Sequence, residues 1–276
     1  MKPIGTFPFG QPILPVRQED RGPKKVFVLG VYASAVHARW IGPDGKQLIS
    51  AVGVASEPEI FWRGDKEQAA EIIQRISLPK GAGSLAPANE QHNGPSGRAL
   101  DELILQPLDL KRSDTWLCDL VPNSCMNPGQ KRALKRAYDP LMTKLGLPAY
   151  NWPDVPAILA CKERVKEIEA ELIESKAELL ITLGNLPLRW FASLYGAKTT
   201  LAEYGKKQGE YGQLNPIRIG NRKLHLRPLV HPRQAGRLGQ HSRELAELHA
   251  EWIALSRSAH TVEPDAHRAV FYLRAK

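Results

Sequence analysis

Residues 24–40, KKVFVLGVYASAVHARW, constrain the fold more than any other stretch of the chain. They form an apolar, β-branched run with Gly30 inside it and small residues after it. A strand this apolar needs cover on both faces, which is typical of the parallel sheets of α/β proteins. Ligands of such sheets bind at the carboxyl ends of the strands. We therefore expect Gly30 to form a turn that leads into a binding site, although first strands also end in glycine where no chemistry follows.

Further apolar runs alternate with helical patterns along the rest of the chain. The predicted core strands are residues 115–121, 179–183 and 223–229, with an edge strand at 217–219. The predicted helices are residues 161–175, 187–195 and 243–255, and residues 94–105 are predicted to be a glycine-bearing loop that leads into another helix. This alternation predicts an α/β fold with a parallel sheet, in which the strand ends converge.

We expect one domain over residues 1–276, with an extended arm at 1–23 and a basic tail at 256–276. Segments 36–40 and 47–54 flank Asp44-Gly45, a strong turn signal, and so predict an inserted β-hairpin. A helix should follow at residues 65–77, and then a long loop at 78–93.

The balance of charged residues indicates a polyanionic partner. The chain has 38 lysines and arginines against 29 acidic residues, a net charge of +9, although ordinary solubility could explain this as well. Its three cysteines lack the spacing of a zinc site or a disulfide framework. No segment is long and apolar enough to span a bilayer or act as a signal peptide, which predicts a soluble, cytoplasmic protein that binds no membrane.

Two strand ends carry residues that a buried strand does not need. Asp119 lies inside an apolar run, where an unpaired carboxylate is costly unless the strand opens on a site. His231 follows the last core strand and precedes a loop with Arg233 and Arg237. Ser96 and Arg98, at the start of a predicted helix, are weaker candidates for a phosphate site, because a helix amino terminus attracts anions.

Four segments, in this order, resemble the motifs of the uracil-DNA glycosylase superfamily. LGVYASA is similar to the first motif, which reads GQDPYH, GEAPG or GMNPG in different branches. The segment GPSGRALDELILQPLDLKRSDTWLCDLVPNS resembles the one that ends in the base-reading Asn, LLITLGN the third strand, and LVHPRQAGR the final HPSP-type motif. The resemblance implies a three-layer α/β/α sandwich around a central, mainly parallel four-stranded sheet, with the β-hairpin as an insertion.

The chain departs from the superfamily pattern at two positions. Tyr32 occupies the place where the GQDPYH branch has a water-activating Asp. Asp119 replaces the base-reading Asn, unless the register slips so that Asn123 takes that place. Water would then be activated by another group, for which Glu57, Asp65 and Asn123 are candidates, or catalysis would rely on stabilising the departing base.

The resemblance implies a role for each matched residue. Asp119, His231 and Tyr32 would form the catalytic set, with His231 donating a hydrogen bond to the base carbonyl. The base-binding residues would be Gly30, Val31, Ser34, Trp62 and Asn123. The DNA-binding residues would be Ser96, Arg98, Lys131, Arg132, Arg233 and Arg237, with Leu238 as a wedge in the minor groove. No cofactor and no metal are expected, and the protein should act as a monomer.

The aspartate at position 119 decides the substrate expected of such an enzyme. Uracil presents a ring N–H beside a carbonyl, which an amide complements and a carboxylate opposes. Cytosine presents an amine beside a ring nitrogen, which a carboxyl group can match. Since excision of unmodified cytosine would be suicidal, we expect a hydroxymethyl or glucosylated cytosine, as in some phage DNA, and so a role in antiviral defence.

Two other interpretations remain open at this point. The chain could be a conventional uracil-excising repair enzyme, or it could flip and hold bases without cutting them. The DNA in each case would be a duplex with one flipped nucleotide, or a single strand.

Overall fold

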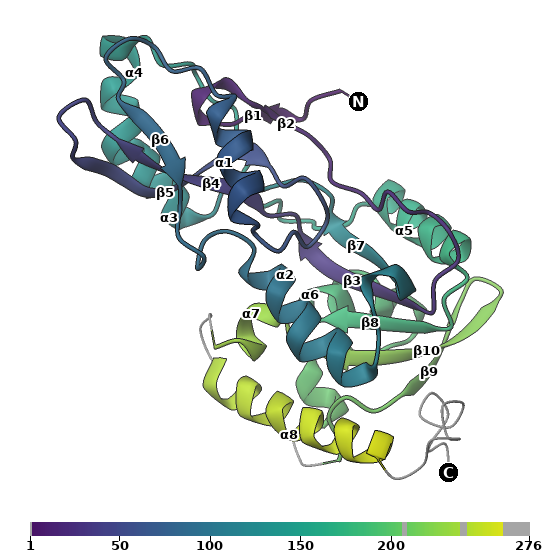
Figure 1. Ribbon diagram of the computed structural model, residues 1–276. Coiled ribbons are helices and arrows are strands. Elements are labelled where there is room, and N and C mark those ends of the chain that lie inside the picture. The colour runs from purple at the N-terminus through teal and green to yellow at the C-terminus, as the bar shows by residue number, and fades with distance from the viewer. Residues whose placement is uncertain (1, 206–208, 238–241, 262–276) are drawn as a thin grey trace. The chain divides into compact units, whose positions relative to one another are not determined.

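The computed structural model describes residues 2–205, 209–237 and 242–261 (Figure 1). Its internal contacts divide the chain into two compact units, each built from three separate segments. Unit 1 comprises Met1–Glu19, Tyr32–Arg98 and Val121–Leu159, and unit 2 comprises Asp20–Val31, Ala99–Leu120 and Ala160–Lys276. Each unit is described by itself.

Unit 2 is built on a five-stranded sheet with the strand order β7-β3-β8-β10-β9. These strands are β3 (Val26–Tyr32), β7 (Thr115–Val121), β8 (Leu179–Leu183), β9 (Asn215–Ile219) and β10 (Arg222–Leu229). Strand β8 pairs in parallel with both β3 and β10, whereas β9 runs antiparallel to β10. Each core strand that the sequence predicts is therefore present.

Hydrogen bonds at both ends of β3 and β7 show that these two strands run in the same direction. The Lys25 amide, one residue before β3, donates to the Asp114 carbonyl, one residue before β7, over 2.9 Å. At the other end, the Ala33 amide donates to the Val121 carbonyl over 3.3 Å. The sheet is thus mixed and mostly parallel. The expectation of four strands is corrected to five, because β9 adds an antiparallel edge.

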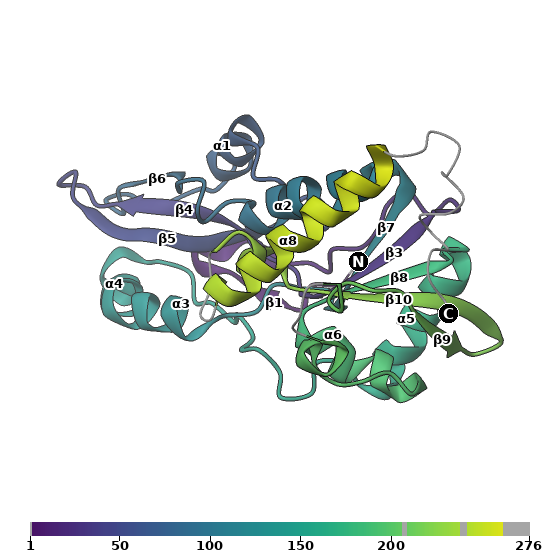
Figure 2. The same ribbon diagram turned by 90° about the horizontal axis from the view of Figure 1, so that it is seen from below.

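Helices cover both faces of this sheet (Figure 2). Helices α5 (Lys162–Ser175) and α6 (Asn185–Trp190) lie on one face, and α8 (Ser242–Thr261) and η2 (Asp101–Leu105), the continuation of α2 (Pro95–Leu100), lie on the other. Helix α5 is amphipathic: it buries Ile168 and Leu172 and exposes most of its charged residues. Ile173, which the apolar spacing places on the same face, is instead 56% exposed. Shorter turns complete the unit: η3 (Gln106–Leu108), η4 (Arg112–Asp114), η6 (Ala192–Tyr195), η7 (Leu201–Tyr204) and α7 (Pro232–Ala235).

Unit 1 contains the predicted hairpin, extended to a three-stranded antiparallel sheet. Strands β4 (Ala35–Ile41) and β5 (Gln47–Ser56) pair across the Asp44-Gly45 turn, and β6 (Ser84–Pro87) adds to the free edge of β4. Segment 78–93 is therefore not all loop. Helix α1 (Lys66–Gln74) starts where expected, with the Asp65 carboxylate accepting from the Gln68 amide over 2.8 Å.

The amino-terminal segment belongs to the core of unit 1 rather than lying on its surface. It forms β1 (Gly5–Thr6), η1 (Pro8–Gly10) and β2 (Pro12–Ile13), and it buries Phe7, Phe9 and Ile13. The Phe9 ring packs edge-on against Trp40 and Tyr138, so apolar area removed from water holds the segment in place.

The remaining helices of unit 1 follow β7 in the sequence. They are α3 (Pro128–Ala133), η5 (Leu134–Tyr138) and α4 (Asp139–Leu145). Within the described ranges, no helix has the length and apolar composition needed to cross a membrane. The tail strand expected near residues 269–273 lies outside the described residues.

Candidate functional site

The carboxyl-end edge of the unit 2 sheet is where a ligand site is expected. The chain runs from β3 outward to β7 and then returns to β8 on the other side of β3. The direction of winding therefore reverses between β3 and β8, and ligands of open α/β sheets bind beside such a reversal. Asp119 and His231 both lie at this edge, near the ends of β7 and β10.

Asp119 is a buried carboxyl group with an open hydrogen-bonding position. Its residue is 3% exposed, and among the described residues its Oδ1 atom has no hydrogen-bond partner. Burial raises its pKa from 3.8 to about 7, although the Arg164 charge acts in the opposite direction. Oδ1 is thus a buried hydrogen-bonding position that no described residue fills.

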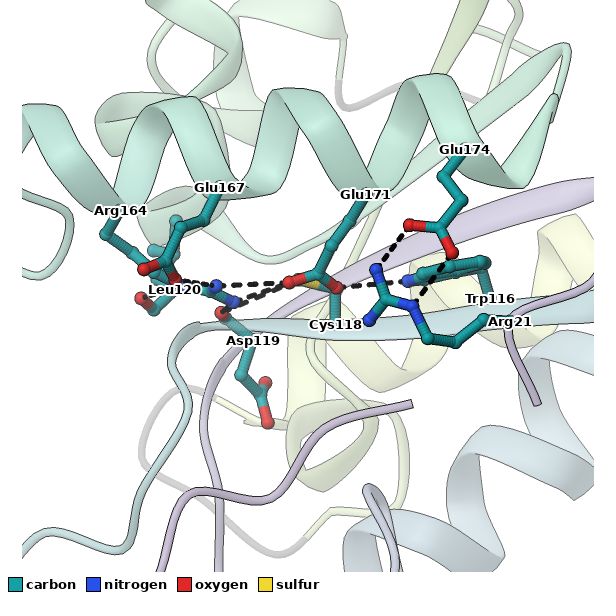
Figure 3. A network of polar contacts seen from close by, with 9 residues as sticks. All are labelled: Arg21, Trp116, Cys118, Asp119, Leu120, Arg164, Glu167, Glu171 and Glu174. Carbon is teal, nitrogen blue, oxygen red and sulfur yellow. Dashed lines mark hydrogen bonds and ion pairs between the residues drawn. The ribbon is translucent and has the colours of Figure 1, made fainter. Parts of the chain in front are cut away.

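A network of buried polar groups fixes the backbone behind Asp119 (Figure 3). The Arg164 guanidinium, on α5, donates to the carbonyls of Asp119 and Leu120 over 2.7 and 3.2 Å. It also forms an ion pair with Glu171 at 3.1 Å. In Figure 3 the Asp119 carboxyl group points away from α5 and from this network. Arg164 therefore holds the main chain that presents Asp119 without neutralising its carboxyl group directly.

His231 caps the short helix α7 through its own ring. The Arg233 amide donates to His231 Nδ1 over 3.2 Å, so that Nδ1 acts as an acceptor and the proton of the neutral ring lies on Nε2. Desolvation, and to a lesser extent the charge of Arg233, lower the pKa of His231 to about 4. The residue is partly exposed. At neutral pH it is therefore an uncharged imidazole with one N–H left to donate.

The spacing between these two groups follows from the strand order. Strands β7 and β10 are separated by β3 and β8. Three strand spacings amount to about 14 Å. Thr182, on β8 between them, is fully buried, and its hydroxyl group has no partner among the described residues. Among its described residues, unit 2 thus holds three buried side-chain polar atoms without a hydrogen-bond partner, Asp119 Oδ1 on β7, Thr182 Oγ1 on β8 and Arg227 Nε on β10.

Glycine positions at this edge differ from the expectation. Gly30 and Val31 lie within β3, which continues to Tyr32, so Gly30 forms no turn. The turn-forming glycine is Gly184, after β8, whose φ of 86° and ψ of −173° suit glycine. Its amide donates to the Leu229 carbonyl over 2.7 Å. A side-chain Cβ at this position would lie 3.5 Å from the Cβ atom of His231, so Gly184 and His231 are neighbours.

Four predicted site residues belong to unit 1: the catalytic candidate Tyr32 and the base-binding candidates Ser34, Trp62 and Asn123. Tyr32 is 39% exposed. The Ser34 amide donates to the buried carboxylate of Glu57 over 3.0 Å. Trp62 lies in the hydrophobic core and donates to Gln68 Oε1 over 2.6 Å.

The alternative residues for water activation also have defined places in unit 1. Asn123 is buried, and its amide group donates to the Ser124 carbonyl over 3.1 Å. Asp65 caps α1. Of the three carboxylate and amide candidates, Glu57 is the buried carboxylate that contacts the segment just after Tyr32.

The predicted DNA-contacting residues fall into two groups. Arg98 donates to the carbonyls of Arg63, Asn93 and Glu90, and so stabilises a loop. Ser96 lies inside α2 and not at its cap, because the helix starts at Pro95. Exposed cationic side chains remain at Arg132, Arg233 and Arg237, whereas Lys131 pairs with Asp154 at 2.6 Å. Leu238 lies outside the described residues.

Sequence reasoning missed the supporting residues Arg164, Tyr211 and His249. Arg164 lies in an amphipathic helix, where its charge suggests a solvent-facing position, yet it is 8% exposed. Tyr211 and His249 are separated by 38 positions in the chain. Only the fold brings such partners together.

No protein-family model matches this chain, and a search of curated proteins found no match. Its function has to be inferred from its own residues.

Proposed function

We propose that this protein is a monofunctional DNA glycosylase, which flips a base out of DNA, hydrolyses its N-glycosidic bond and leaves an abasic site. The observation that carries the proposal is the pair of polar groups at one sheet edge, Asp119, whose Oδ1 has no partner among the described residues, and neutral His231.

Cleavage of an N-glycosidic bond develops negative charge on the departing base and positive charge on the sugar. His231 Nε2–H would donate to the base carbonyl as that charge forms. A neutral donor whose position is fixed beforehand stabilises such charge without reorganisation. Because the pKa of His231 is about 4, the ring stays neutral across the physiological range.

Asp119 would read the Watson–Crick edge of the base. A cytosine amine can donate to its open Oδ1, and the protonated carboxyl group can donate to the ring nitrogen. Because its pKa is about 7, both forms of the acid exist near neutral pH. We propose a modified cytosine, hydroxymethylated or glucosylated, as the substrate, since release of ordinary cytosine would damage the host. Such bases occur in some phage DNA, so the cellular role would be antiviral defence.

Uracil is the second candidate substrate, and the pKa of Asp119 is the observation that favours it. In a protonated carboxyl group, one oxygen can donate its proton to the uracil carbonyl while the other accepts from the ring N–H. In the ionised form no proton is available, and the negative charge repels the uracil carbonyl. Uracil release should therefore fall as pH rises through about 7. Release of a cytosine derivative should fall less, because the ionised group still accepts from the amine.

The test is mass spectrometry of the bases released from duplex oligonucleotides that carry one uracil, hydroxymethylcytosine or glucosylated hydroxymethylcytosine. We expect release of a modified cytosine and strand breaks after alkali. The variants Asp119→Asn and His231→Gln should each lower the rate by 100-fold or more, in line with the loss of a positioned catalytic group.

Three results would contradict parts of this proposal. Release of uracil alone, unchanged in Asp119→Asn, would exclude the cytosine assignment. Retention of modified DNA without alkali-labile sites would identify a reader of flipped bases. No retention and no release would overturn the glycosylase proposal as a whole.

A further inference from the structure

The residue just before His231 is held by a chain of buried hydrogen bonds. The Tyr211 hydroxyl group accepts from the Val230 amide over 2.8 Å and lies 2.8 Å from His249 Nδ1. His249 Nε2 in turn lies 2.8 Å from the carbonyl of Leu103, in η2. Tyr211 and His249 are 4% and 1% exposed, so solvent does not compete for these contacts.

Chemistry fixes the direction of every hydrogen bond in this chain. A carbonyl oxygen only accepts, so His249 Nε2 carries the proton that is donated to Leu103. Burial lowers the pKa of His249 to about 4, so its ring is neutral and Nδ1 must accept. The Tyr211 hydroxyl group therefore donates to Nδ1, and its oxygen is left to accept from Val230. No other arrangement satisfies all four groups.

The position of Val230 explains why this series of hydrogen bonds matters for His231. Strand β10 ends at Leu229, so the Val230 amide lies beyond the last strand pair that the sheet provides. A buried amide without a partner would be costly, and Tyr211 supplies the partner. On the other side, the amides of Gln234 and Ala235 donate to the His231 carbonyl over 2.8 and 3.1 Å. The main chain is thus fixed immediately before and after His231.

We propose that Tyr211 and His249 are positioning residues that set the place of the His231 ring. The proposal rests on the proposed function only for the statement that His231 is catalytic. The link from η2 through α8 to the end of β10 defines where His231 Nε2–H is presented. A displacement of about 1 Å at a catalytic group can lower a rate by about 100-fold.

The experiment compares Tyr211→Phe with a matched variant from unit 1. Tyr138→Phe also removes a buried hydroxyl group between two backbone groups, since Tyr138 Oη accepts from the Phe9 amide over 3.1 Å and donates to the Pro148 carbonyl over 2.7 Å. Under single-turnover conditions with a duplex that carries glucosylated hydroxymethylcytosine, Tyr211→Phe should lower the rate 10- to 100-fold with little change in the half-saturating DNA concentration. Tyr138→Phe should stay within twofold of the wild-type rate.

A second readout does not depend on any activity. Long-range ¹H–¹⁵N spectra of the histidine rings report which nitrogen carries the proton. Tyr211→Phe should shift or broaden the ring signals of His231, and Tyr138→Phe should leave them unchanged. His249→Gln serves as the second variant, with the same result expected.

These two readouts separate the two proposals. If the wild-type protein releases no base from any DNA but Tyr211→Phe perturbs the His231 ring, the proposed function fails and the positioning role stands. If Tyr211→Phe and His249→Gln fold and leave both the His231 signals and the rate unchanged, the positioning role is overturned. If neither variant folds, the hydrogen bonds of Tyr211 and His249 serve stability alone, and the positioning role is likewise overturned.

Discussion

At the residue scale, Asp119 and His231 titrate in the reverse of the order that is usual for an aspartate and a histidine. Burial raises the pKa of Asp119 to about 7 and lowers the pKa of His231 to about 4. Between these values both groups are uncharged, whereas in free amino acids both would be charged at pH 5. The edge thus offers hydrogen bonds without net charge, which suits the reading of a neutral base.

Removal of the Asp119 charge should stabilise the protein. The raised pKa means that the folded state binds a proton more tightly, so this stabilising contribution is complete below pH 3.8 and is lost as pH rises through about 7. Asp119→Asn should therefore raise the free energy of unfolding by about 1–3 kcal/mol at pH 8. Urea denaturation at pH 8 and at pH 4 measures this gain.

The control for this prediction is Asp139→Asn, at an exposed position in unit 1, where the asparagine side-chain oxygen can still accept the hydrogen bond from the Tyr150 hydroxyl group. Its free energy of unfolding should change by less than about 0.5 kcal/mol at either pH. Equal stability of wild type and Asp119→Asn at pH 8 would show that the carboxyl group is solvated or paired.

Sequence reasoning selected Asp119 and His231 as candidates because each interrupts a pattern, one an apolar run and the other a strand end. It could not identify Tyr211 and His249, because their role depends on partners that folding alone brings together. The sequence pattern around a histidine in an amphipathic helix is the same whether its ring only packs in the core or also forms hydrogen bonds to distant residues.

At the scale of elements, a buried ion pair within α5, Arg164 with Glu171, joins this helix to β7 through hydrogen bonds. Arg164 donates to the carbonyls of Asp119 and Leu120, and Glu171 accepts from Trp116 Nε1. Arg164→Met would remove the buried cation that pairs with Glu171, whose side chain is 5% exposed. Loss of one partner of a buried pair costs about 3–5 kcal/mol, so the variant should unfold at a much lower urea concentration. The double variant Arg164→Met/Glu171→Gln should recover part of that loss, because no unpaired charge remains.

The matched control is Arg243→Met on α8. Arg243 pairs with Glu247 at 3.1 Å, but its side chain is 88% exposed. Exposed pairs contribute at most about 1 kcal/mol, so this variant should be nearly as stable as wild type. A similar loss from Arg164→Met and Arg243→Met would contradict a special role for the buried pair.

Strands with continuous apolar sequences were predictable as elements, because burial on both faces leaves few other options. Strand β7 appears over the predicted residues. Gly30 was not predictable, since a glycine in an apolar run suits a strand and a turn equally well. Strand β6 was missed because SLAP is short and ends in proline, and only its pairing with β4 makes it a strand.

At the scale of the whole molecule, stability should depend on pH in a defined way. His231 and His249 have folded pKa values of about 4 against 6.5 in the unfolded chain, so stability falls on acidification from about pH 6.5 to 4. Asp119 has the opposite effect on stability: its folded pKa is raised, so its contribution to stability decreases as pH rises. Stability should rise by up to about 1 kcal/mol per pH unit between pH 4.5 and 6, with less from the partly exposed His231 than from His249.

The same variants test this profile. In Asp119→Asn the rise between pH 4.5 and 6 should be steeper, and in His249→Gln it should be shallower. Urea midpoints measured from pH 4.5 to 8 give both slopes, and identical slopes in all three proteins would refute the assignment.

The interleaved layout of the two units also governs how the protein is made. Both units draw on three separate segments, and Val26 of the first central strand pairs with Leu179 of β8. A ribosome releases β3 long before its neighbour β8 exists, so the sheet cannot close during early translation. Contacts this distant in sequence slow folding. The nascent chain therefore carries an exposed apolar strand through most of its synthesis, and chaperones that bind such strands should influence its yield.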